Sequence, residues 1–151
     1  MDTRLALALC GSLAFAAPLA AQPVAVANSV YVEREIAAPS GRAVRTLEPA
    51  TALRRGDRVV YFLSWRAPQP ERFTITNPLP RSVAYERSAG GLEEVSVDGG
   101  RTWGRIDTLK VRDGTRWRNA TPEDVTHVRF QVPARLALAG SGRLTWSGIV
   151  R

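Results

Sequence analysis

The stretch GDRVVYFLSWR, residues 56–66, decides the fold of this chain. Its apolar side chains alternate, and one face carries Val59, Tyr61, Leu63 and Trp65. The opposite face carries Val60 and Phe62 between more polar neighbours. A period of two indicates a β-strand, because successive side chains of a strand point to opposite faces. A strand that is apolar along one face, and at the middle of the other, is typical of the centre of a sheet.

The same alternation continues on both sides of this strand. Before it, Val30, Val32 and Ile36 alternate with polar residues, and residues 43–47 are a candidate second strand. After it, short alternating segments recur at 73–76, 83–85, 95–97, 109–111, 128–132 and 144–150. Glycine, proline and aspartate separate these segments, and no amphipathic helical pattern of any length interrupts them. The sequence therefore predicts an all-β sandwich or barrel.

The first 21 residues have the layout of a secretory signal peptide. Arg4 precedes an apolar run over residues 5–19, and small residues follow at Ala20 and Ala21. The run is shorter than the roughly 20 residues that span a bilayer. We therefore expect cleavage after Ala21, a flexible lead-in over residues 22–29 and one domain over residues 30–151. The mature protein is expected in the periplasm or outside the cell, with no membrane span.

Cysteine usage and charge limit the chemistry of the mature domain. The only cysteine, Cys10, lies in the leader, so neither a disulfide nor a thiolate metal site is expected after cleavage. The chain has 21 basic and 14 acidic residues and a net charge of +7. Such a charge could favour anionic partners, but the arginines are scattered among acidic residues, which favours an ordinary solvated surface. Export argues against a nucleic-acid partner.

Three segments together resemble a known bacterial family. They are GDRVVYFL at 56–63, FTITNPLP at 73–80 and VAY at 83–85. The pattern resembles the "conserved repeat domain", a family of unknown function in secreted and cell-surface proteins. The resemblance is best over residues 30–88 and implies an Ig-like β-sandwich, here of about seven to nine antiparallel strands. It supplies no catalytic residues.

The chain also departs from that family. Between the two strands the family has an Asn and a Gly, whereas this chain has Arg66–Arg72 with two prolines. We also expect a lone domain here and not a tandem array. A stalk or adhesin-like role therefore stays open.

The sharpest local motif is SVDGGRTW, residues 96–103. It matches the Asp-box pattern, whose members here are Ser96, Asp98, Gly100, Thr102 and Trp103. An aspartate can accept hydrogen bonds from turn amides, glycines reverse the chain, and the tryptophan packs on the turn. A propeller needs several blades, so one motif predicts only a structural hairpin.

The four tryptophans divide into two pairs. Trp65 and Trp146 lie on apolar faces of their strands and are expected in the core. Trp103 and Trp117 lie near turns and are the candidates for exposed, sugar-stacking rings. For Trp117, a role as a core anchor after the Asp113-Gly114 turn is the alternative.

No pattern of catalytic residues is found. His127 is the only histidine and is expected to hydrogen-bond locally. Glu93 and Glu94 are neighbours in a strand and so point to opposite faces, which prevents them from flanking one scissile bond. No phosphate loop, dinucleotide motif or metal-ligand cluster occurs, so we predict no catalytic, cofactor-binding or metal-binding residues.

The sequence thus predicts a non-catalytic exported module with a structural or binding role at the cell envelope. Its partner would be an envelope protein, or an anionic envelope polymer held by Arg54, Arg55 and Arg58. The alternative is a small carbohydrate-binding or carbohydrate-active protein that uses the Asp-box hairpin with Trp103 and Trp117.

Overall fold

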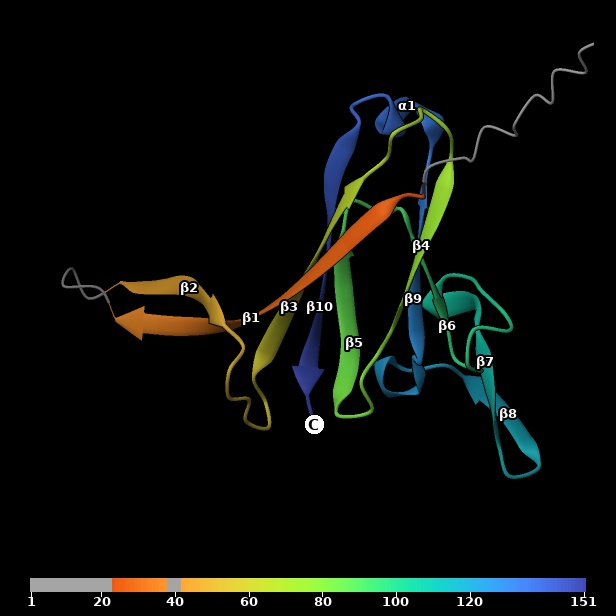
Figure 1. Ribbon diagram of the computed structural model, residues 1–151. Helices are drawn as coiled ribbons and strands as arrows, with labels where there is room; N and C mark the ends of the chain where they lie inside the picture. The colour runs from red at the N-terminus through yellow and green to blue at the C-terminus, as the bar shows by residue number, and fades with distance from the viewer. Residues whose placement is uncertain (1–22, 38–41) are drawn as a thin grey trace, which may run out of the picture.

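A computed structural model describes residues 23–37 and 42–151 of the chain (Figure 1). The expected signal peptide, residues 1–21, lies outside the described residues. The strands are β1 (Ala25–Ala37), β2 (Ala43–Pro49), β3 (Arg58–Arg66), β4 (Phe73–Pro78), β5 (Val83–Ala89), β6 (Glu93–Ser96), β7 (Lys110–Asp113), β8 (Arg116–Asn119), β9 (His127–Val132) and β10 (Ser141–Val150). Helical structure is limited to η1 (Ile106–Thr108), η2 (Pro122–Asp124) and α1 (Ala134–Ala137).

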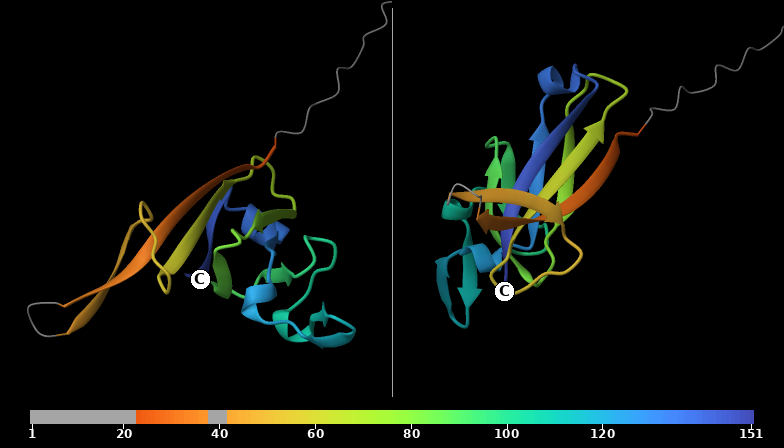
Figure 2. Two further views of the ribbon diagram at one scale, coloured as in Figure 1. Left: turned by 90° about the horizontal axis from the view of Figure 1, so that it is seen from below. Right: turned by 90° about the vertical axis from the view of Figure 1, so that its left-hand side faces the viewer.

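The strands form two larger sheets and one separate hairpin. The first sheet has the order β2-β1-β3-β10-β5, the second has β4-β9-β6, and β7 pairs only with β8. Every strand pair is antiparallel. The two larger sheets pack on one shared core (Figure 2), which confirms the prediction of an all-β, antiparallel protein. The described residues hold ten strands, more than the seven to nine expected; β8, which pairs only with β7, is the strand that the alternation did not predict.

The core lies between the inner faces of these sheets. Strand β3 is paired on both sides, by β1 and β10, as its two-faced apolar pattern predicts. Trp146 of β10 stacks on Tyr61 of β3, with ring centroids 3.9 Å apart and planes 3° apart. Trp65 meets Phe73 of the second sheet edge-to-face at 5.1 Å. Trp65 and Trp146 are both buried, as predicted.

The prediction of a flexible lead-in over residues 22–29 is wrong from residue 25 onward. Strand β1 begins at Ala25 and pairs with β3 from Ala25 opposite Arg66 to Ser29 opposite Phe62. The side chains of this segment give no strand signal, since they are small or polar. Its backbone nevertheless supplies the donors and acceptors that the edge of β3 requires.

The outer half of β1 leaves the sandwich. Beyond the β3 pairing it pairs only with β2, and this hairpin arm extends away from the body (Figures 1 and 2). Val32 is buried, but Ile36 is about half exposed. The inward alternation expected from Val30 therefore ends before Ile36. Arg34, which interrupts the apolar face, donates from Nη1 to Asp57 Oδ1 at 2.6 Å and ties the arm to the turn before β3.

Candidate functional site

The hairpin β7–β8 carries a basic and aromatic face. Gly114 makes its tight turn with a φ of +61°, a conformation that other residues rarely adopt. The register places Arg112 opposite Trp117 and Lys110 opposite Asn119. Directly opposed residues of an antiparallel pair share a face, so Lys110, Arg112 and Trp117 lie on the same one. The hairpin projects from the body on the side away from the β1–β2 arm (Figure 1).

Trp117 is 66% exposed, which decides between the two expectations for it: the ring is exposed and is not a core anchor. Among the described residues, no carboxylate lies within ion-pair distance of Lys110, Arg112 or Arg116. A large exposed aromatic ring among uncompensated cations is unusual on a protein surface and is typical of contact surfaces.

The base of the hairpin is held by one ion pair. Arg118 donates from Nη1 and Nη2 to the two carboxylate oxygens of Asp124, at 2.6 and 2.8 Å. Asp124 also accepts from the amide and hydroxyl of Thr121, which caps η2. The Arg118 guanidinium, with these donors, holds the pKa of Asp124 well below its usual range. The base is therefore anchored to the body, while Lys110 and Arg112 have no carboxylate partner among the described residues.

The Asp-box residues form a closed network in the loop after β6. Asp98 accepts from Ser96 Oγ at 2.8 Å, from the amides of Arg101 and Thr102 at 3.0 and 2.9 Å, and from Thr102 Oγ1 at 2.7 Å. Trp103 donates from Nε1 to the carbonyl of Gly100 at 2.9 Å. The bonds from the amides to Asp98 are the ones that the motif predicts, and all of these hydrogen bonds join residues 96–103 to one another.

Trp103 is covered and does not form an open platform. The Arg129 guanidinium lies 4.4 Å from the centroid of its ring, and Glu94 holds Arg129 in place. The His127 ring meets Trp103 edge-on at 6.2 Å, and its Nδ1 lies 3.1 Å from Thr126 Oγ1. His127 therefore makes the local contact expected of it.

We predict that the Asp98 network makes stability fall in acid. Hydrogen bonds, first of all from the Thr102 amide and hydroxyl, hold the pKa of Asp98 well below its ordinary value. A lowered folded-state pKa stabilises the native protein above the unfolded value of about 4, and this stabilisation disappears as the pH falls. Asp98→Asn should therefore be less stable at neutral pH and should lose less stability on acidification. Urea midpoints of both proteins at neutral and acid pH test this, and equal losses would contradict it.

The structure separates the three arginines that the sequence grouped as an anion site. Arg54 and Arg55 lie exposed in the turn before β3, where Asp57 Oδ2 accepts from the Arg54 amide at 2.8 Å. Arg58 instead pairs with Glu33 at 3.2 Å and with Glu86. Its charge is already compensated, so Arg58 is not available to an anion.

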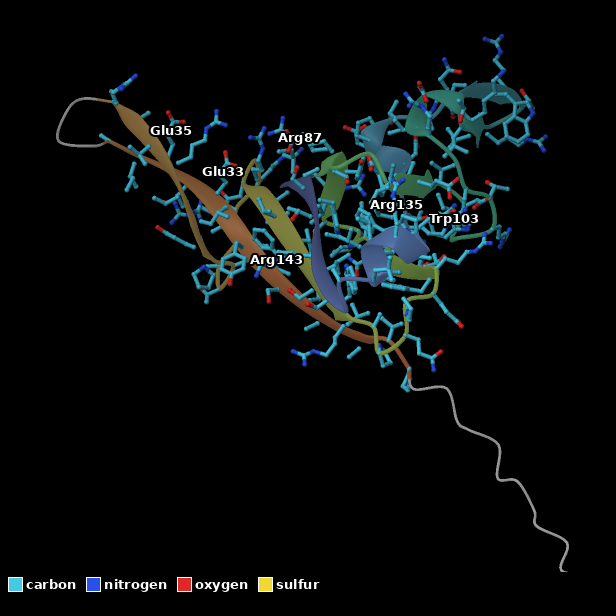
Figure 3. The ribbon with its side chains drawn as sticks, turned by 90° about the horizontal axis from the view of Figure 1, so that it is seen from above. Glu33, Glu35, Arg87, Trp103, Arg135 and Arg143 are labelled. Carbon is cyan, nitrogen blue, oxygen red and sulfur yellow. The ribbon has the colours of Figure 1, made fainter. Side chains whose placement is uncertain are left out.

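Arg58 lies in a groove that sequence reasoning missed. The groove has a volume of about 430 Å³, crosses the outer face of the five-stranded sheet and includes Arg45, Val60, Arg87, Thr145 and Ser147 in its wall. Figure 3 shows Glu33 and Arg87 on this side of the molecule. The groove depends on the register of five strands from distant parts of the chain. The sequence signal for this face was the position of Arg58 and Val60 on the more polar side of β3.

Within residues 23–37 and 42–151, no group of three or more histidine, cysteine or carboxylate side chains could hold a metal ion. In the same residues, no helix is long and apolar enough to cross a membrane. Comparison of the chain with family models, curated proteins and solved structures finds no match.

Proposed function

We propose that this chain is a non-catalytic binding module of the bacterial cell envelope, and that the β7–β8 hairpin binds an anionic envelope polymer. One observation carries the proposal: Trp117 is two-thirds exposed on the same face as Lys110 and Arg112, neither of which has a carboxylate partner among the described residues. Uncompensated cations attract polyanions, and a flat amphipathic ring adds contact area.

The proposed fold is an Ig-like sandwich. It is supported by strands β1-β3-β10-β5 in one sheet and β4-β9-β6 in the other, because a constant-type Ig domain packs four strands on three; here β2 extends the first sheet to five strands. The order along the chain differs, because the last strand, β10, lies between β3 and β5. Membership of the conserved repeat domain family is part of the proposal and rests on residues 56–85. Export rests on residues 1–21.

The anionic ligand is preferred to the neutral glycan of the alternative function. That alternative needs two open rings, and Arg129 covers Trp103. A single ring, Trp117, remains, and its nearest companions on the hairpin are cations.

Retention on an anionic polysaccharide resin at rising salt tests this function. The double variant Lys110→Ala, Arg112→Ala should bind at least about tenfold more weakly, because it removes two charges that salt screens. Trp117→Ala should weaken binding less.

The double variant Arg54→Ala, Arg55→Ala is the matched control, because it removes exposed arginines elsewhere on the surface. Its affinity should stay within about twofold of the wild type. An equal loss in both multiple variants would show that net charge alone drives retention and that the hairpin is not the site. Retention that salt does not weaken would also contradict the proposal.

A further inference from the structure

A second cavity, separate from the proposed hairpin surface, opens at the side of the core between β5 and β6. Its volume is about 340 Å³, and its wall includes Tyr85, Glu93, Val95, Arg105, Ile106 and Asp107. Glu93 lies opposite Phe130 of β9 and on the same face of β6 as the buried Val95. A carboxylate therefore lies on the inner face of a strand, where apolar side chains are expected.

The Glu93 carboxylate accepts fewer hydrogen bonds than its two oxygens require. Oε1 accepts one long hydrogen bond, from the Tyr85 hydroxyl at 3.5 Å. Oε2 is buried and has no hydrogen-bond partner among the described residues. Burial and the neighbouring Glu93 charge raise the pKa of Tyr85, so the phenol stays neutral. Buried carboxylates in native proteins are normally paired, so an unpaired oxygen beside a cavity points to a missing donor.

Arg105, the one cationic side chain of the cavity wall, is already paired with Asp107. Arg105 donates from Nε and Nη2 to the two oxygens of Asp107, at 3.2 and 3.1 Å, and both side chains are largely exposed. Their charges cancel, and Glu93 leaves the cavity with one net negative charge. In a protein with a net charge of +7, this is a local site for a cation.

We infer that this cavity binds an alkylammonium group. The ammonium would donate to Glu93 Oε2 and meet the aromatic ring of Tyr85, which favours cations, while the alkyl part would lie against Val95 and Ile106. The volume is at the small end of ligand pockets, which suits a short chain. The group could belong to a free amine or to a lysine side chain of a partner.

Amide chemical shifts of the full chain, titrated with n-pentylammonium, test the inference. We expect saturable shifts around residues 91–95 and 104–107, and none of comparable size with n-pentanol, the neutral analogue. An acetylated and amidated Gly-Lys-Gly peptide distinguishes the sources: tighter binding than pentylammonium indicates a lysine side chain, and weaker binding indicates a free amine. Absence of saturation by both cations, or equal binding of pentanol, would overturn the inference.

Glu93→Gln and Glu94→Gln make a matched pair of variants. Glu93 and Glu94 are consecutive in the chain, but Glu94 lies on the opposite face of β6, where Arg129 and Gln131 donate hydrogen bonds to it. Glu93→Gln should weaken pentylammonium binding at least about tenfold, because it removes the charge. Glu94→Gln should change it less than about twofold, and an equal effect of both would refute the site.

Two further variants separate a loss of ligand binding from a loss of folding and from a change elsewhere on the surface. If Glu93→Gln unfolds, as a collapsed amide spectrum would show, Glu93→Asp keeps the charge and should retain binding with altered affinity. The hairpin variant Lys110→Ala, Arg112→Ala should bind pentylammonium like the wild type. The proposal for the cavity and the proposal for the hairpin can therefore be refuted independently.

Discussion

Replacing Trp146 by alanine is expected to lower the free energy of unfolding by about 3–5 kcal/mol. Trp146 is 1% exposed and lies between the two sheets, stacked on Tyr61 and near Tyr85. Removing the ring loses its transfer energy and leaves a cavity that neighbouring rings cannot fill. Since domains of this size are stable by about 5–15 kcal/mol, the variant should be barely folded.

Urea unfolding followed by far-ultraviolet circular dichroism measures this loss. Trp117→Ala is the matched control, because it removes the same side chain from an exposed hairpin. Its stability should change by less than about 0.5 kcal/mol. Comparable losses in the two variants would mean that Trp146 is not part of a shared core.

Replacing Gly148 by alanine should cost about 1–3 kcal/mol, as overpacking does elsewhere. A Cβ at this position would lie 2.6 Å from the carbonyl oxygen of Ala84 and 2.5 Å from a methyl group of Val83. The register of β10 with β5 shifts between Ser147 and Gly148, and at Gly148 no side chain stands between β10 and the backbone of β5. Backbone atoms cannot rotate away, and therefore β5 itself must move.

Gly104→Ala is the control for this prediction. Its nearest neighbour would be Thr108 Oγ1 at 3.3 Å, on an exposed side chain that can yield. The urea midpoint should fall clearly in Gly148→Ala and much less in Gly104→Ala. The reverse order would contradict the close approach of β5 and β10.

The two proposed surfaces carry opposite charge. The hairpin surface concentrates uncompensated cations around an exposed ring, whereas the cavity at Glu93 holds one uncompensated carboxylate beside a buried phenol. A polyanion and an ammonium ligand would therefore not compete for the same groups. This separation allows each proposal to be tested in the presence of the other ligand.

Several local features could be predicted from single segments. The alternation over residues 56–66 predicted a strand paired on both sides, and β3 is one. The Asp98 contacts with turn amides join residues close together in the chain, so the motif was sufficient to predict them. Glu93 and Glu94 were expected on opposite faces, and they contact Tyr85 and Arg129 respectively.

Other features depended on contacts between distant segments. The strand character of residues 25–29 comes from the edge of β3, not from their own side chains. Arg58 was predicted to bind an anion, but its charge is compensated. The register places Glu33 beside it, and the fold brings Glu86 to its other side.

What the sequence by itself determined was the class of structure: antiparallel strands, the turns between them, the core positions of Trp65 and Trp146, and the Asp-box loop. These follow from the period of the side chains and from turn chemistry, which act over a few residues. Only the tertiary structure decided that Trp117 is exposed while Trp103 is covered, and that Glu93 lies at a cavity. Burial and charge compensation depend on which strands become neighbours, and that pairing joins residues far apart in the chain.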